Sequence, residues 1–279
     1  PSAPGILRGR VAGACREREI PVRTLPTVFE LLRGGVQLTR QLREVQVEDV
    51  LGRDPIVMEL DRVGAYLEDR IVLVTGAGGS IGAELCRQIT RVGPRLLVLV
   101  DHAEDNLFQV DRELTQEWHF SGVESVLADC REPDRMLEVM QRFKPEIVFH
   151  AAAYKHVPLM QANAVEAFNN NVWGTLNVMR QAEAHGAKRV VYVSTDKAVH
   201  PTNVMGATKR IGELIVADLG RQSTSTRFSG VRFGNVLESE GSVMQTFRQQ
   251  LQSGRNLTVT HPDITRYFMT IDEAAQLVI

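Results

Sequence analysis

The sequence predicts an α/β fold, a doubly wound parallel sheet with helices on both faces. Three observations support this prediction. Continuous apolar runs at residues 71–74 and 96–100 are typical of parallel strands buried on both faces. Helical patterns alternate with such runs along the chain, as βαβ units require. A glycine-rich turn at residues 75–82 joins the first of these strands to the first helix.

Residues 1–65 and residues 66–279 differ in character. The first segment has no clear fold of its own, and we interpret it as a lead-in that packs on the main domain. The second segment carries the regular pattern, with strands expected at residues 71–74, 96–100, 123–128, 146–149 and 191–193. Helices are expected directly after Gly82 and at residues 104–118, 133–143 and 158–186.

Beyond residue 193 the pattern is less regular. A helix is expected up to about Leu219 and another at residues 241–251, with short strands at residues 230–233, 257–260 and 266–269. The chain stops inside an amphipathic pattern and begins without methionine. We therefore expect a fragment of a longer protein, which holds only part of a C-terminal substrate-binding lobe.

Composition argues against several classes of function. The net charge of -2 gives no basis for binding nucleic acid or an anionic membrane surface. No apolar run approaches membrane-spanning length. The cysteines are few and widely spaced, which argues against a disulfide framework and a zinc site. Metal binding is not expected, because no partner at helical spacing accompanies His150, His156, His200 or His261.

The turn at residues 75–82 reads TGAGGSIG and places its glycines in the pattern G-x-x-G-x-x-G. Gly76 permits the tight turn, Gly79 lets the backbone approach a pyrophosphate, and Gly82 lets the helix pack on the sheet. Ser80 and Ile81 begin the helix, whose N-terminal N–H groups and positive dipole end suit phosphates. The pattern predicts a dinucleotide-binding turn, and an ordinary tight turn is the alternative.

Residues at the ends of other strands would complete this site. Asp101 ends the second strand about 20 residues after the last glycine, where an acid binds the adenosine ribose. A carboxylate there repels a 2′-phosphate, so NAD is favoured over NADP. Asp129 and Cys130 follow the third strand and are expected at the adenine edge. Ala151 and Ala152 follow the fourth strand, where small side chains permit close approach of a flat ligand.

Three chemically active side chains follow the fifth strand in succession: Thr195, Asp196 and Lys197. Ligands of parallel α/β sheets bind beyond the carboxyl ends of the strands, so a substrate is expected beside this triplet. Lysine is scarce in this chain, and Lys can lose its proton when desolvated, whereas Arg cannot. The alternative, in which Asp196 and Lys197 are solvated loop charges, stays open at this point.

With these residues identified, the chain resembles the extended short-chain dehydrogenase/reductases that act on nucleotide sugars. The shared features are TGAGGSIG, Asp101, Asp129, HAAA at His150, Asn171 and the stretch from Arg266. It resembles more closely the bacterial nucleotide-sugar 4,6-dehydratases of polysaccharide biosynthesis, the CapD/WbpM-like family. The matching phrases are AAAYKHVPLM from Ala151, NNVWGT from Asn170, VSTDKAVHPTNVMGATKR from Val193 and RFGNVL from Arg232. The resemblance covers nearly the whole chain from about residue 22.

This resemblance implies an NAD-dependent 4,6-dehydratase whose substrate is a UDP-linked N-acetylhexosamine, with UDP-N-acetylglucosamine expected first. It implies Asp196 as the acid at C6, Lys197 as the base at C5 and Thr195 as a hydrogen-bond partner of the C4 oxygen. Lys209 is expected to hold the nicotinamide ribose and to bias Lys197 towards its neutral form. Met205 stands where the superfamily carries a tyrosine base, and the membrane-anchored branch of the dehydratases shares this methionine.

The resemblance also implies the wider setting. The expected substrate-binding residues are Lys155 near the sugar, Asn235 and Arg266 at the diphosphate, and Asn171 and Met205. The whole protein is expected to be a homo-oligomer at the cytoplasmic face of the inner membrane, anchored only by segments outside this chain. Two alternatives remain: a UDP-sugar C4 epimerase on the same scaffold, and an NAD-sensing module without turnover.

Overall fold

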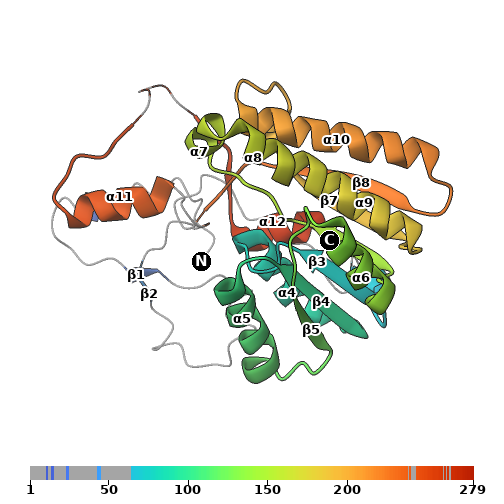
Figure 1. Cartoon of the computed structure of the whole chain (residues 1–279). Helices are drawn as coiled ribbons and strands as arrows, with labels where there is room; N and C mark the ends of the chain where they lie inside the picture. Colours follow the sequence, from blue (N-terminus) through green and yellow to red (C-terminus); the bar gives the residue numbers. More distant parts are fainter. Residues whose placement is uncertain are drawn as a thin grey trace.

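The computed structural model describes residues 64–237, 239, 243–259, 261, 263 and 265–279, and also residues 11, 14, 15, 23–24 and 43–44. Its main sheet has six parallel strands in the order β5-β4-β3-β6-β7-β8 (Figure 1). This confirms the predicted α/β fold and places β7 fifth in the sequence of main-sheet strands. The strands are β3 Ile71–Thr75, β4 Leu96–Asp101, β5 Val123–Leu127, β6 Ile147–His150, β7 Arg189–Thr195 and β8 Arg227–Phe233.

The central strands are apolar throughout because helices cover both faces of the sheet. In β3, Val72 and Val74 belong to one hydrophobic cluster and Leu73 to the other. Successive side chains of a strand point to opposite faces, so a strand covered on both faces has no polar side. The first cluster includes residues of α4 Ser80–Val92, α5 Glu104–Arg112 and α12 Ile271–Val278. The second includes residues of α6 Pro133–Phe143, α9 Gly174–Ala184 and α10 Val204–Gln222.

The direction in which strands are added reverses at the centre of the sheet, between β3 and β6. β4 and β5 extend the sheet from β3, whereas β7 and β8 extend it from β6 on the other side. The connections after β3 and β6 therefore diverge and leave a crevice beyond the carboxyl ends, where ligands of such sheets bind. The glycine-rich turn after β3 and the triplet after β7 both lie at this edge of the sheet.

Two predicted helical regions, the first expected as one helix and the second as several helices, each form more than one segment in the structure. The helix predicted at residues 104–118 comprises α5 and a π-helical segment, η4 Glu113–Glu117. The region predicted at residues 158–186 comprises α7 Val157–Ala162, α8 Ala164–Phe168, the π-helical segment η5 Asn169–Trp173, and α9. The remaining elements are η3 Gly64–Leu67, η6 Asp196–Ala198 and α11 Val243–Gln252.

One predicted strand is wrong, and another is shorter than predicted. Residues 257–259 lie in no strand, and residue 260 is outside the described part of the chain. The Gln250 side chain on α11 instead accepts a hydrogen bond from the Thr258 N–H at 3.1 Å. This backbone group is therefore bonded to a side chain and not to a neighbouring strand. Of the strand predicted at residues 266–269, β10 Phe268–Met269 forms and pairs in parallel with β9 Asn235–Val236.

The interpretation of residues 1–65 as a lead-in falls mostly outside the described residues. Within that segment, β1 Arg23–Thr24 pairs antiparallel with β2 Arg43–Glu44. Among the described residues, η3 packs on the main sheet's helices, because Leu67 is fully buried in the cluster that includes α4. Among the helices that the structure describes, none has both the length and the apolar character needed to cross a membrane.

Candidate active site

Two neighbouring cavities lie beyond the carboxyl ends of the central strands. The larger has a volume of about 320 Å³ and the smaller about 260 Å³. Ala151, Ala153 and Tyr154, in the loop after β6, line both cavities, so the two meet at the centre of the sheet. Residues after β3, β4 and β5 line the smaller cavity, and residues after β7 and β8 line the larger one.

The glycine-rich turn lines the smaller cavity through Gly76 and Gly79. Gly76 has φ +70°, and a Cβ atom there would lie 2.6 Å from the backbone nitrogen of Ala152. A Cβ atom on Gly82 would overlap the carbonyl oxygen of Gly76. Helix α4 begins at Ser80, and no side chain caps its N-terminus at Gly79. The close packing of this turn and the uncapped helix end together fit the phosphates of a dinucleotide.

We expect Gly76→Ala to destabilise the fold and to weaken dinucleotide binding. A left-handed residue with a Cβ costs about 1–2 kcal/mol, and overlap with the Ala152 backbone adds about 1–3 kcal/mol. Gly93→Ala is the matched control, because Gly93 also has positive φ (+78°) but faces open space. Thermal unfolding of both variants checks this. Equal losses of stability in the two would show that the approach to Ala152 is unimportant.

The acid predicted at the ribose is buried and held by the backbone. Asp101 is 8% exposed, and its two carboxylate oxygens accept the N–H groups of Gly78 and Ala103, each at 2.9 Å. It lines the smaller cavity together with Asp129 and Cys130. These contacts fix a negative charge at the β4 end of the cavity, the end at which the adenosine half of a dinucleotide is expected.

Asp129 and Cys130 differ in chemical state. Burial raises the pKa of Asp129, but hydrogen bonds from Arg131 outweigh this effect and hold that pKa below its usual range. The Arg131 guanidinium lies 2.6 Å from the Asp129 carboxylate. Burial raises the pKa of the Cys130 thiol to about 12, so it stays protonated at neutral pH. A protonated thiol is a poor nucleophile, which leaves Cys130 as a small apolar contact in the cavity wall.

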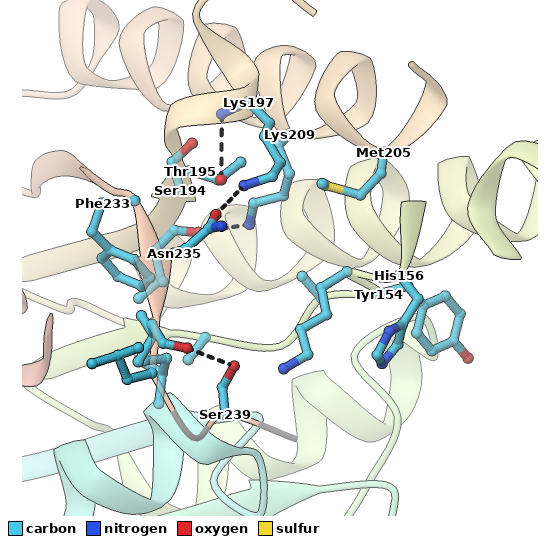
Figure 2. A pocket seen from close by; sticks show the side chains of 18 of the residues that line it. Tyr154, His156, Ser194, Thr195, Lys197, Met205, Lys209, Phe233, Asn235 and Ser239 are labelled. Carbon is cyan, nitrogen blue, oxygen red and sulfur yellow. Dashed lines mark hydrogen bonds between the residues drawn. The ribbon is translucent and has the colours of Figure 1, made fainter. Parts of the chain in front are cut away.

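The predicted catalytic triplet forms a connected group after β7. The Thr195 hydroxyl donates to the Asp196 carboxylate at 3.0 Å, and the Lys197 amine lies 3.0 Å from the same carboxylate oxygen. The Lys197 amine also donates to the side-chain oxygen of Asn235 at 2.9 Å (Figure 2). Thr195, Lys197 and Asn235 line the larger cavity, whereas Asp196 is not among the residues that line it. Lys197 therefore lies in the cavity wall, whereas Asp196 is an exposed residue that is linked to the cavity by its hydrogen bonds with Thr195 and Lys197.

Lys209 is buried in the wall of the larger cavity. It is 5% exposed, its amine donates to the Val193 carbonyl at 2.6 Å, and it lies 4.1 Å above the Tyr192 ring. Burial lowers the pKa of Lys209 to about 7, and the nearby Glu213 carboxylate offsets only part of that effect. Met205, one helical turn earlier on α10, lines the same cavity. A neutral amine is thus accessible at physiological pH in this part of the site.

An ion-pair network that sequence reasoning missed supports this wall. Glu213 on α10 accepts from Ser194 on β7 at 2.6 Å, from Arg232 on β8 at 2.6 Å and from Arg210 at 2.9 Å. Burial raises the pKa of Glu213, but these hydrogen bonds outweigh it and lower the pKa to about 2. The network ties β7, β8 and α10 together beside Lys209, four residues earlier on the helix. The only sign of this network in the sequence was the four-residue spacing of Lys209 and Glu213, which places both on one face of a helix.

A neutral histidine, also missed, lies behind the site. His150 at the end of β6 is hydrogen-bonded to the hydroxyls of Thr75 at 2.7 Å and Thr175 at 3.0 Å. Its ring stacks on Tyr192 at 5.8 Å between centroids. Burial, together with a smaller effect of the Lys209 charge, lowers the pKa of His150 to about 3. His150 therefore acts as a structural bridge between strands and α9 at neutral pH.

The residues predicted to bind the substrate fall into two groups. Lys155, Met205 and Asn235 line the larger cavity, next to Ile81 from the glycine-rich turn. Asn171 and Arg266 do not line it. Arg266 is exposed and donates to the carbonyl of the preceding residue at 2.8 Å.

Asn171, which was expected to contact the substrate, is hydrogen-bonded within the fold in this structure. It is 1% exposed. Its amide group accepts the Tyr154 N–H at 2.8 Å and donates to the Tyr154 carbonyl and the Thr208 hydroxyl, each at 3.0 Å. Its side chain is therefore occupied within the fold, and the geometry supports a role in positioning the loop between the two cavities.

Comparison with known proteins places this arrangement in a family. The family model described as "Polysaccharide biosynthesis protein" matches residues 72–279. The capsular polysaccharide biosynthesis protein CapD of Staphylococcus aureus is 45% identical over 267 residues, which cover 95% of this chain and 44% of that protein. This chain thus spans less than half the length of that relative.

Two further similar proteins have names that state a reaction. A protein of Rickettsia rickettsii named UDP-glucose 4-epimerase is 32% identical over 217 residues, which cover 76% of this chain and 62% of that protein. The crystal structure of DesIV, a dTDP-glucose 4,6-dehydratase from Streptomyces venezuelae with NAD bound, superposes with a TM-score of 0.64 at 22% identity. The match covers 74% of this chain and 69% of DesIV, and at this identity it shows the shared fold.

Proposed function

Because the chain belongs to the polysaccharide biosynthesis protein family, we propose that it carries the chemistry of an NAD-dependent nucleotide-sugar 4,6-dehydratase. The proposed substrate is a UDP-linked N-acetylhexosamine, and UDP-N-acetylglucosamine is the first to test. The observation that best supports this is the pair formed by Asp196 and Lys197, 3.0 Å apart at the end of β7 beside the larger cavity. Loss of water from a sugar requires one acid and one base, and this pair supplies both.

The smaller cavity fits the adenosine and phosphate parts of NAD. Gly76 and Gly79 would receive the pyrophosphate at the start of α4, and Asp101 would accept the ribose hydroxyls. The fixed carboxylate of Asp101 disfavours a 2′-phosphate and so supports NAD over NADP. NAD bound here would supply hydride removal from the sugar and hydride return to it.

Thr195 and Lys197, which line the larger cavity, and Asp196, which is paired with both, divide the proton chemistry between them. Lys197 removes the C5 proton, which is acidic once C4 is a ketone, and Asp196 protonates the departing C6 hydroxyl. Thr195 hydrogen-bonds the C4 oxygen, since Thr195 lines the cavity and its hydroxyl lies beside the Asp196 carboxylate. Asn235 keeps the Lys197 amine in place through their 2.9 Å hydrogen bond.

Incubation of the purified protein with NAD and UDP-N-acetylglucosamine tests this function. The expected product is a UDP-4-keto-6-deoxy sugar, identified by mass spectrometry as the substrate less one water. Tight NAD binding with no sugar-dependent change in nicotinamide absorbance would instead support a sensing module without turnover. Either that result or an unchanged sugar mass contradicts the dehydratase.

A C4 epimerase is the second candidate, and its support is the relative from Rickettsia rickettsii that is named UDP-glucose 4-epimerase. An epimerase returns the hydride to C4 and needs no acid at C6. The same incubation separates the two reactions, because UDP-N-acetylgalactosamine has the mass of the substrate and a distinct NMR spectrum. The Asp196–Lys197 pair favours the dehydratase, since epimerisation gives that pair no role.

A further inference from the structure

Oxidation of the sugar at C4 releases a proton from the C4 hydroxyl as well as a hydride, and a group in the larger cavity must accept that proton. This requirement rests on the proposed function. The titratable side chains that line the larger cavity, among the described residues, are Tyr154, Lys155, His156, Lys197 and Lys209. Met205 also lines it, but a thioether is not a base at neutral pH.

Three of these side chains are poorly placed for the task. The Tyr154 ring meets His102, a residue of the smaller cavity, edge-on at 6.5 Å between centroids. Its hydroxyl points away from Lys197 and Lys209 (Figure 2). Lys155 and His156 are exposed residues of the loop after β6, where water competes for their protons. None of the three is desolvated as a base in the cavity wall would be.

Lys197 is committed to another role. Its amine donates to the Asp196 carboxylate at 3.0 Å and to Asn235 at 2.9 Å, contacts that suit an ammonium group. In the proposed reaction, the neutral Lys197 amine accepts the C5 proton. If it had already accepted the proton of the C4 hydroxyl, it would have no lone pair left for the proton from C5. A separate acceptor is therefore required.

We infer that Lys209 accepts the C4 hydroxyl proton in the oxidation step. Its amine is buried in the cavity wall, and one N–H is fixed on the Val193 carbonyl at 2.6 Å. A neutral amine anchored in this way keeps a lone pair for a proton. In the step itself, the O–H bond breaks and its proton moves to Nζ of Lys209. A nicotinamide bound beside the cavity would accept the C4 hydrogen with its electron pair as hydride, and the C4–O double bond forms.

The surroundings of Lys209 suit a group that must be both neutral and protonated in one cycle. Burial favours the neutral amine and lowers the pKa to about 7. Three neighbours stabilise the ammonium once it forms: the Tyr192 ring at 4.1 Å, the Val193 carbonyl and the Glu213 carboxylate. His150, behind Tyr192, stays neutral because burial lowers its pKa to about 3. Lys197, which lines the same cavity, is already paired with Asp196.

A direct test measures the amine without turnover. The chain has five lysines, so selective carbon-13 labelling of lysine gives few NMR signals, and Lys209→Gln identifies the one from Lys209. We expect this signal to titrate near pH 7 in the protein without cofactor. Lys188→Gln, which removes an exposed lysine, is the control and should leave that titration unchanged. A Lys209 amine that stays protonated to pH 9 would overturn the inference.

A kinetic test separates proton acceptance from charge. Arginine keeps a positive charge but does not release its proton, so Lys209→Arg should lose oxidation by at least about 10²-fold, as should Lys209→Gln. In the unmodified protein, the oxidation rate should fall about tenfold per pH unit below the titration midpoint. Oxidation by Lys209→Arg within a few-fold of the unmodified protein would overturn the inference, because Lys209 would then act only through its charge.

An exchange assay shows whether a failure belongs to this inference or to the proposed function. When the 4-keto-6-deoxy product is supplied in heavy water, exchange of its C5 proton needs Lys197 but no C4 hydroxyl acceptor. We expect Lys209→Gln with saturating NAD to retain this exchange while losing oxidation. If the unmodified protein neither exchanges C5 nor oxidises the sugar, the proposed function fails. If Lys209→Gln oxidises the sugar normally, only the inference fails.

Discussion

Replacing Lys197 with methionine is expected to lower turnover by roughly 10²- to 10⁴-fold and to leave NAD binding intact. Methionine keeps the length and apolar stem of the side chain but has no amine to remove the C5 proton. The residues that we propose bind NAD lie mainly around the smaller cavity, which Lys197 does not line. The variant should therefore still oxidise the sugar at C4, and a reduced nicotinamide signal should appear without release of water.

Two measurements check this expectation. Calorimetric titration with NAD should give the same affinity for Lys197→Met as for the unmodified protein. Exchange of the C5 proton of the 4-keto-6-deoxy product in heavy water should disappear. Lys188→Met is the matched control, because it removes an exposed lysine outside both cavities. Normal turnover by Lys197→Met would remove Lys197 from the mechanism and leave the base unassigned.

The sheet was predictable because its signals are local. Strands such as β3 are buried on both faces, so Val72, Leu73 and Val74 must all be apolar, and this run is visible without knowledge of the partners. The glycine turn is equally local, since Gly76 and Gly82 are required by contacts within the turn and with the loop after β6. Position after a strand then sufficed to bring Thr195 and Lys197 to one cavity.

The parts that escaped prediction depend on contacts between distant segments. In the sequence, Glu213 looks like an ordinary acidic residue on a helix surface. Its role becomes visible only in the fold, where Ser194 on β7 and Arg232 on β8 donate hydrogen bonds to it. The role of Asn171 appears only when the loop after β6 folds back to place the Tyr154 backbone against it. Residues 257–259 carry strand-forming side chains, yet a strand also needs a neighbour, and none pairs with them in the described structure.

The second large effect is expected for Asp196→Asn. In the structure, the Asp196 carboxylate and the Lys197 amine form an ion pair at 3.0 Å, a state in which the acid lacks its proton and the base carries one. Transfer of that one proton from Nζ to the carboxylate would give a protonated acid and a neutral base in a single step, with no proton exchange with solvent. Asparagine accepts the Thr195 hydroxyl as aspartate does, but it cannot take up this proton or pass it to the C6 hydroxyl.

We therefore expect Asp196→Asn to slow release of water by roughly 10²- to 10⁴-fold, with NAD binding and C4 oxidation retained. C5 exchange on the supplied product should also persist, because Lys197 keeps its contact with Asn235 and can pass its proton to solvent when no carboxylate pairs with it. This combination differs from that of Lys197→Met, which loses the exchange. Asp218→Asn is the matched control, since Asp218 is a half-exposed carboxylate paired with Arg221 at 3.0 Å, away from both cavities. Water release by Asp196→Asn at the rate of that control would mean that the acid at C6 is a group other than Asp196.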